Sequence, residues 1–239
     1  MAICKGCGLD KKLIKAHAIP ESFFVKMKKE YGKPKIMTDA EGEYPKKSPI
    51  GVYDDQILCY SCENIFGNFD DYGFNILLRQ EQLHEELIKD GKVVGYKIIN
   101  VDYKKLKLFF ISVLWRASIS SQKFYSRVKL GSSEKKAKEL IWNNDAGKQS
   151  EFSVVLTKFT DTTVGRIMLD PDIEQWDGVN YCRIYMYGYV VYIKIDDRDS
   201  SNRLKKFELS PNKKLIVPAR NIGRSSELSI ISAIIKKAL

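Results

Sequence analysis

Two Cys-x-x-Cys pairs, Cys4/Cys7 and Cys59/Cys62, are the residues of this sequence whose types and spacing point most directly to chemistry. Each pair can fold tightly around a metal ion, and four thiolates at about 2.3 Å complete the tetrahedral shell of a structural zinc. The sequence therefore predicts one Zn²⁺ site built from all four cysteines. The alternative that the spacing leaves open is a Cys3His site completed by His17.

His17 lies between the two cysteine pairs, in the segment Lys15-Ala16-His17-Ala18-Ile19-Pro20. If the cysteines fill the zinc shell, this histidine is not needed as a ligand. An imidazole with an unperturbed pKa of about 6.5 can then act as an acid or a base near neutral pH. The simpler interpretation is a histidine that only packs against the zinc core.

Composition and cysteine usage favour a cytoplasmic globular protein. The chain has 239 residues with 44% hydrophobic content, which is enough for a real core. Cysteines at metal spacing, with Cys182 alone in an apolar run, indicate a reducing compartment rather than a secreted disulfide framework. The N-terminus has no apolar signal segment, and the longest apolar stretch, residues 106–115, is too short to span a bilayer. We therefore expect no membrane partner.

The positive charge of the chain is concentrated in its middle. Of the net charge of +10, most comes from residues 104–148, which carry 11 Lys or Arg against 3 Asp or Glu. Such a surface would bind phosphates regardless of sequence and with strong salt dependence, so we expect a nucleic acid, DNA first, as partner. The residues assigned to this contact are Lys123, Arg127, Lys135, Lys136 and Lys138. The alternative is that they are only solvated helix faces.

The elements around the cysteines follow the order of a treble-clef zinc finger. A short strand ends with His17 before Pro20, and a helix is expected over residues 21–31. A second strand, residues 56–58, leads into the second cysteine pair, and a helix is expected from residue 63 to about residue 89. Strand, cysteine pair and helix in this order build a treble clef.

The rest of the chain predicts an α+β fold. Residues 92–103 have strand character, and the helix over 106–119 is apolar nearly all round, which indicates burial. Arg116 within that helix needs a partner that the sequence does not identify, whereas Asp70 is expected to be surface charge. A helix over 134–142, then strands and a last amphipathic helix, complete a mainly antiparallel sheet region. We divide the chain into a zinc-binding region, 1–100, and an α+β region for substrate or partner protein, 101–239.

Three segments resemble the HNH endonuclease family, in which zinc sites often brace a ββα-metal core. They are Cys4-Lys5-Gly6-Cys7, Ala16-His17-Ala18-Ile19-Pro20 and Leu58-Cys59-Tyr60-Ser61-Cys62-Glu63-Asn64, and they cover about the first 65 residues. Residues 114–118 resemble a segment of an uncharacterised bacterial branch of this family. The resemblance implies hydrolysis of nucleic-acid phosphodiester bonds with Mg²⁺ or Mn²⁺, and bacterial defence as a setting.

The resemblance also assigns roles to single residues. His17 matches the general base, and Asp54 or Asp55 stands where the family has an asparagine that orients the base. Glu63, followed by Asn64, stands where the helix supplies a metal ligand. The chain departs from the family at Ala16, where an acidic residue is usual. Either Glu63 supplies the missing carboxylate, or the site has lost its metal.

These departures keep two functions open. The first is a metal-dependent HNH-type endonuclease. The second is a non-catalytic zinc-finger module that binds nucleic acid or a partner protein. On that second view Asp54 and Asp55 are turn residues, and Glu63 begins a helix, where its charge favours the helix dipole.

Overall fold

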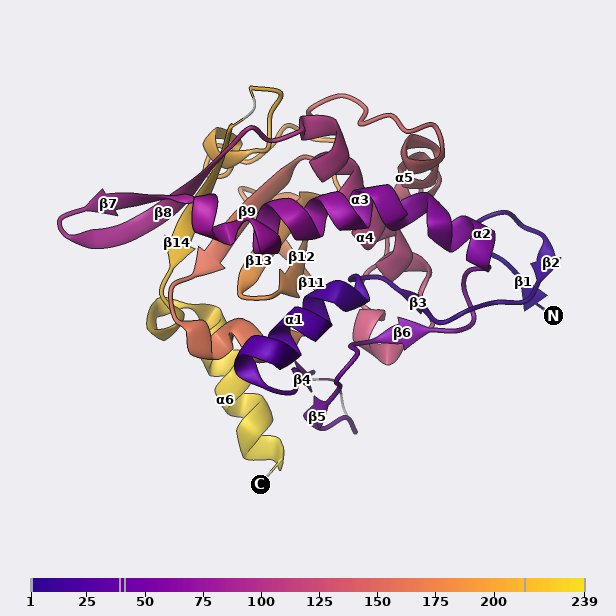
Figure 1. Cartoon of the computed structure of the whole chain (residues 1–239), viewed down its shortest axis with the longest axis horizontal. Helices are drawn as coiled ribbons and strands as arrows, with labels where there is room; N and C mark the ends of the chain where they lie inside the picture. The colour runs from indigo at the N-terminus through magenta and orange to yellow at the C-terminus, as the bar shows by residue number, and fades with distance from the viewer. Residues whose placement is uncertain (1, 39, 41, 213, 239) are drawn as a thin grey trace.

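The computed structural model describes residues 2–38, 40, 42–212 and 214–238. Its fold is α+β, as predicted, with helices packed against a large mixed sheet (Figure 1). The helices of the described chain are α1 (Glu21–Tyr31), α2 (Tyr60–Glu63), α3 (Gly67–Phe74), α4 (Tyr103–Ile119), α5 (Ser133–Trp142) and α6 (Ser226–Ala238). The short helical turns are η1 (Asn64–Phe66), η2 (Asn75–Arg79), η3 (Glu81–Leu83), η4 (Lys123–Tyr125), η5 (Thr162–Arg166), η6 (Lys205–Phe207) and η7 (Ile222–Arg224).

The large sheet is antiparallel except where β14 runs parallel to β9. Its seven strands, in spatial order, are β11 (Asp172–Trp176), β12 (Val179–Met186), β13 (Tyr189–Lys194), β9 (Val154–Phe159), β14 (Lys214–Arg220), β8 (Lys92–Ile99) and β7 (Glu85–Lys89). The mainly antiparallel sheet expected after the helix over 134–142 is thus confirmed, and strands from before residue 100 extend it. Core residues from both sides of the boundary predicted at residue 100 pack into one hydrophobic cluster.

Alternation along the strands gives this sheet two apolar faces. Leu156 and Val191, which are paired across β9 and β13, belong to the cluster that contains α4. Val155 and Tyr192, the next pair, belong to the cluster that contains Ile231 of α6. Helices α4 and α6 therefore cover opposite faces of the sheet.

Helix α4 is the central helix of the larger core. Its residues 106–119 are buried on all sides, as the apolar sequence predicts. The side chain of Asp102 caps its start by accepting a 3.0 Å hydrogen bond from the backbone amide of Lys105. Helix α3 approaches closely at Gly73, where an added Cβ would lie 2.6 Å from the ring of Phe109. This glycine lets α3, which follows the second cysteine pair, pack directly on α4.

The helix expected to reach residue 89 is shorter than predicted. The helical path ends at η3, and residues 85–89 form strand β7, which pairs with β8. The reason is the turn Asp90-Gly91, where both residues have positive φ, 51° and 70°. Such a turn matches the twist of an antiparallel hairpin, so the local backbone chemistry favours strands over further helix.

The N-terminal region has the expected order of strand, strand and helix, but the second strand lies earlier than predicted. Strand β3 (Ala16–His17) pairs antiparallel with β6 (Tyr53–Asp54), whereas residues 56–58 are not a strand, because the amide of Gln56 donates to the Asp54 side chain and the chain bends there before α2. A small hairpin, β1 (Ala2–Ile3) with β2 (Asp10–Lys11), carries the first cysteine pair. A separate three-stranded sheet has the order β10 (Ile167–Leu169), β4 (Lys35–Met37) and β5 (Lys46–Lys47). In the described part of the chain, no helix is both long enough and apolar enough to cross a membrane.

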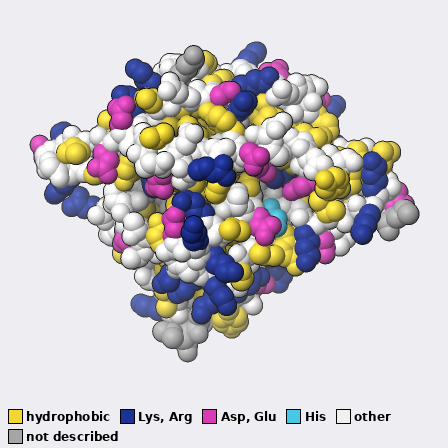
Figure 2. All heavy atoms as spheres, in the orientation of Figure 1, with side chains coloured by type: hydrophobic (Ala, Val, Ile, Leu, Met, Phe, Trp, Pro, Cys, Tyr) yellow, Lys and Arg dark blue, Asp and Glu magenta, His cyan; other side chains and the backbone are white. Residues whose placement is uncertain are grey.

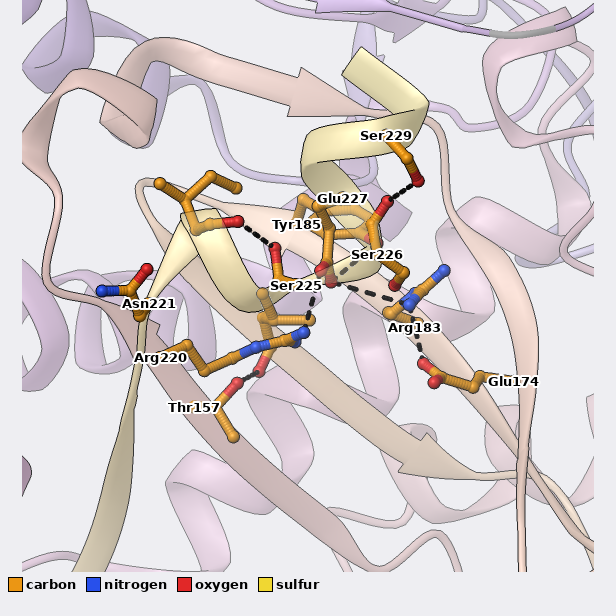
Figure 3. Close-up of polar contacts among 12 residues, drawn as sticks. Thr157, Glu174, Arg183, Tyr185, Arg220, Asn221, Ser225, Ser226, Glu227 and Ser229 are labelled. Carbon is orange, nitrogen blue, oxygen red and sulfur yellow. Dashed lines mark hydrogen bonds and ion pairs between the residues drawn. The ribbon is translucent and has the colours of Figure 1, made fainter. Parts of the chain in front are cut away.

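Helix α6 is fixed to the sheet by a buried ionic network (Figure 3). Glu227 in its first turn is 1% exposed and accepts a 2.8 Å hydrogen bond from Arg220. Arg183 lies 3.6 Å from the same carboxylate, and its guanidinium also pairs with Asp172 and Glu174. The charges compensate one another inside the protein, so removing one partner would leave another uncompensated.

Candidate functional site

The two cysteine pairs come together into one cluster, as predicted. The four Sγ atoms of Cys4, Cys7, Cys59 and Cys62 lie within 4.8 Å of one another. The Sγ atoms of Cys7 and Cys59 are 4.0 Å apart, against about 3.8 Å for two thiolates on a tetrahedral zinc with 2.3 Å bonds. The cluster therefore has the dimensions of a four-thiolate metal site. His17 does not belong to it, so the Cys3His alternative finds no support.

Backbone hydrogen bonds shape the cluster before any metal is considered. The amide of Gly8 donates to the carbonyl of Cys4 at 2.8 Å and closes the first turn. The amide of Cys59 donates to the Cys4 sulfur at 3.3 Å and joins the two halves. Gly6 lies so close to Cys62 that an added Cβ would be 2.7 Å from its sulfur. Only glycine fits there without displacing a ligand.

The electrostatics of the cluster fit a bound cation. Burial opposes ionisation of Cys4, but hydrogen bonds from the amides of Cys7, Cys59 and Gly6 outweigh it and lower the pKa of this thiol to about 6. Burial raises the pKa of Cys62, and hydrogen bonds with the neighbouring thiols raise it further. A divalent cation with thiolate affinity would hold all four sulfurs ionised, so the donor set fits Zn²⁺.

His17 lies at the end of β3, and a backbone carbonyl orients its ring. The imidazole is 8% exposed, and its Nε2 is 2.9 Å from the carbonyl oxygen of Ile50. A carbonyl can only accept, so Nε2 carries the hydrogen and Nδ1 keeps its lone pair. Burial lowers the pKa of His17. The ring is therefore held neutral in the tautomer whose Nδ1 can take a proton.

Asp54 does not contact His17. In the β3–β6 pair, Asp54 stands opposite Ala16, whereas His17 stands opposite Tyr53. Residues directly opposite one another project to the same face, so Asp54 and His17 project to opposite faces. Asp55 is exposed and accepts a hydrogen bond from Gln56. The carbonyl of Ile50, rather than a carboxylate, is the group that orients the imidazole.

Asp54 instead attaches the end of α4 to the ββα unit. One of its oxygens accepts from the Ser120 hydroxyl at 2.9 Å and from the Ser121 amide at 2.6 Å. The other accepts from the amide of Gln56 at 2.9 Å. Burial raises the pKa of Asp54, but these hydrogen bonds outweigh it and leave the value lowered. This carboxylate is therefore held as an ion by one local donor and by donors from the segment that follows α4.

Glu63 is partly buried beside His17. Burial raises the pKa of Glu63, whereas Arg116 and the backbone amide of His17 act to lower it. Its Oε1 is 4.0 Å from Nη1 of Arg116, and its Oε2 is buried without a hydrogen-bond partner among the described residues. A buried carboxylate oxygen with no partner is rare and fits an atom that binds an ion or water. Asn64, the next residue, is exposed.

The partner of Arg116, which the sequence does not identify, is Asp70. The side chain of Arg116 is fully buried and makes a bidentate ion pair with Asp70, at 2.8 and 2.6 Å. The guanidinium also lies over the ring of Phe66 at 4.6 Å. The expectation that Asp70 is surface charge is wrong, because α3 packs against α4 and carries this carboxylate inward. Arg116 thus places a fixed positive charge next to Glu63.

The five basic residues assigned to nucleic acid are spread over η4, α5 and the segment between them. All have partners within the protein. Lys123 lies 3.0 Å from Glu43 and Arg127 3.6 Å from Asp170. Lys135 and Lys136 lie 4.0 and 3.8 Å from Glu139 and Glu151, and Lys138 donates to the carbonyl of Lys5 at 3.0 Å. Their part in nucleic-acid binding stays a prediction.

The sequence of this chain was compared with protein-family models and with curated proteins, and its structure with solved structures. Nothing in these three comparisons matches it. What the protein does must therefore be inferred from the site itself.

Proposed function

We propose that this protein is a zinc-braced, metal-dependent nuclease that hydrolyses the phosphodiester bonds of nucleic acid, and that its preferred substrate is DNA. The observation that carries the proposal is a tautomer-fixed His17 whose backbone amide lies against Glu63, a residue whose Oε2 is buried and has no hydrogen-bond partner among the described residues. Both side chains come from the ββα unit formed by β3, β6 and α2, whose helix also carries Cys62 of the cysteine cluster. The resemblance to HNH endonucleases in the first 65 residues supports the same assignment and is the only support for a role in bacterial defence.

In this proposal His17 is the general base. Its Nδ1 takes a proton from the attacking water, and Nε2 stays bound to the carbonyl of Ile50 throughout. Because burial lowers its pKa, the imidazole is already neutral at neutral pH. The carbonyl also stabilises the imidazolium that forms, since it faces the protonated nitrogen.

Glu63 is the residue proposed to hold a catalytic Mg²⁺ or Mn²⁺, which when bound would stabilise the charge that develops on the phosphate. A hard cation suits a carboxylate oxygen that has no other partner in the part of the chain that the structure describes. Position 16 is poorly suited to the acid that is usual in the family. Ala16 is 1% exposed and stands opposite Asp54, so a carboxylate there would be buried against another carboxylate.

Cleavage of supercoiled plasmid and of labelled duplexes with Mg²⁺ or Mn²⁺ tests the proposal. We expect His17→Ala to lower the rate about 10²- to 10⁴-fold, because that is the usual contribution of a general base. The matched control is His84→Ala. His84 is a partly buried histidine whose Nε2 lies 2.8 Å from the carbonyl of Ile76, far along the chain from Glu63. Zinc content and circular dichroism should be unchanged in His17→Ala. Equal rates for the two variants, or no metal-dependent cutting by the wild type, would contradict the nuclease.

One observation favours a second function, a zinc-finger module that binds without cutting. Arg116 already pairs with Asp70 and lies 4.0 Å from Glu63, so its charge opposes a divalent cation at the same carboxylate. Glu63→Gln separates the two functions. If the protein is a nuclease, this variant loses metal-dependent cleavage and still binds nucleic acid. If it is a binding module, the wild type does not cleave, and the variant binds as the wild type does.

A further inference from the structure

A basic surface lies outside residues 104–148, the segment in which the sequence concentrates its net positive charge. Lysines gather on the face formed by α1, the β4–β5 hairpin and the end of α6, as Figure 2 shows in dark blue below the centre of the view. We call this the α1–β5 surface. Its lysines are Lys28, Lys29, Lys33, Lys35, Lys46, Lys47, Lys236 and Lys237.

Three segments that are distant in sequence build the α1–β5 surface. Lys28 and Lys29 occupy the last turn of α1. Lys35 on β4 stands directly opposite Lys47 on β5, so these two side chains share a face. The end of α6 reaches the same place, because Lys237 donates to the carbonyl of Ala40 between the two strands at 3.0 Å. Residues 1–103, which are close to neutral overall, therefore contribute most of a strongly basic patch.

The described part of the chain compensates the charges of this surface weakly: Lys123 and, to a lesser extent, Lys46 lower the pKa of Glu43. None of its eight lysines makes an ion pair within the described ranges, and all are exposed except Lys35, which is partly buried. Each of the five basic residues predicted from sequence has a partner within the protein, four of them a carboxylate. Unpaired lysines this close repel one another, and a polyanion relieves that repulsion while releasing its own counterions.

The α1–β5 surface adjoins the candidate active site along the chain on both sides. Helix α1 begins at Glu21, four residues after His17. Strand β5 ends at Lys47, three residues before Ile50, whose carbonyl binds the imidazole of His17. Short segments of chain therefore connect the α1–β5 surface on both sides to the residues that position His17.

We propose that the α1–β5 surface binds the phosphate backbone of a DNA duplex and directs it to His17. The direction to His17 rests on the proposed nuclease function, whereas the binding does not. Because lysines contact phosphates as point charges, this binding is independent of base sequence and weakens with salt.

Two triple variants with the same change in charge test the surface. The first is Lys28→Glu/Lys33→Glu/Lys47→Glu, in which all three side chains are exposed and unpaired in the described structure. The matched control is Lys135→Glu/Lys136→Glu/Lys138→Glu on α5, the positions that the sequence predicted. Binding is followed by fluorescence anisotropy of a labelled 30-base-pair duplex between 50 and 200 mM KCl, without Mg²⁺ or Mn²⁺. Cleavage therefore does not affect the result.

We expect the salt slope of the first variant to fall by about 3, close to one unit for each lysine that contacts a phosphate, and that of the control to stay unchanged. The milder Lys28→Gln/Lys33→Gln/Lys47→Gln should give a reduced slope with the wild-type circular dichroism spectrum. An equal loss in both variants, or a loss in the α5 variant alone, overturns the proposal. So does binding to acidic phospholipid vesicles that is lost in the first variant while duplex binding persists. If duplex binding follows the prediction and no cleavage is found, the proposal for the α1–β5 surface is supported and the proposed nuclease function is contradicted.

Discussion

Arg116→Met should be strongly destabilising, because it leaves Asp70 without its buried partner. Arg116 is fully buried, and its bidentate pair with Asp70 is made at 2.8 and 2.6 Å. Burial already raises the pKa of Asp70, and Arg116 is the group that opposes this. Removing one partner of a buried ion pair typically costs about 3–5 kcal/mol. A domain stable by about 5–15 kcal/mol should still fold, so the loss can be measured.

The assay is urea denaturation at constant zinc, in a double-mutant cycle. Arg116→Met and Asp70→Leu should each be destabilising, and the double variant should lie within about 2 kcal/mol of the wild type, since two apolar residues replace both charges. Lys135→Ala is the control. Its ion pair with Glu139 is exposed, and we expect no measurable change in unfolding. The reasoning is refuted if Arg116→Met costs no more than this control, or if the double variant costs the sum of the two single variants.

Three further outcomes follow from the site. Gly6→Ala should lose bound zinc in elemental analysis, because its Cβ would lie 2.7 Å from the Cys62 sulfur, whereas Gly67→Ala, at a helical position with no atom within 4 Å of the added Cβ, should keep the metal. The acidic limb of the pH–rate profile of cleavage should lie below pH 6.5. The base must be neutral and burial lowers the pKa of His17, so activity is lost only as the pH falls through that lowered pKa. An acidic limb above pH 7 would exclude His17 as the base. Asp54→Asn should destabilise by about 1–3 kcal/mol in urea, since an amide cannot accept all its hydrogen bonds. Because the pKa of Asp54 is lowered on folding, its contribution is present above its unfolded pKa and fades in acid.

Local patterns in the sequence determined much of the fold. The cysteine spacing predicted a cluster that the structure confirms, and the continuous apolar run predicted the buried helix α4. The helix depends on residues near one another in sequence. The cluster depends on metal-binding chemistry that only one arrangement of the four cysteines satisfies. The helix predicted from residue 63 to about residue 89 was too long, which shows the limit of hydrophobic periodicity as evidence. The turn Asp90-Gly91 favours a hairpin, so the residues before it form strand β7.

The site depended on contacts that no local pattern encodes. The group that orients His17 is a backbone carbonyl, which every residue possesses, so nothing in the sequence marks Ile50 for this role. The partner of Arg116 lies 46 positions away and was brought to it by the packing of α3 on α4. Alternation on paired strands turned Asp54 away from the imidazole and towards Ser121.

Charge shows the same division between sequence and structure. The sequence by itself determined the net charge and the residue types that could bind a metal or take a proton. Only the tertiary structure decided which cations are compensated, because ion pairs form between neighbours in space. Residues 104–148 hold most of the excess charge, and much of it is paired with acidic side chains, whereas the lysines from three separate segments that meet on the α1–β5 surface form no ion pair with the described residues.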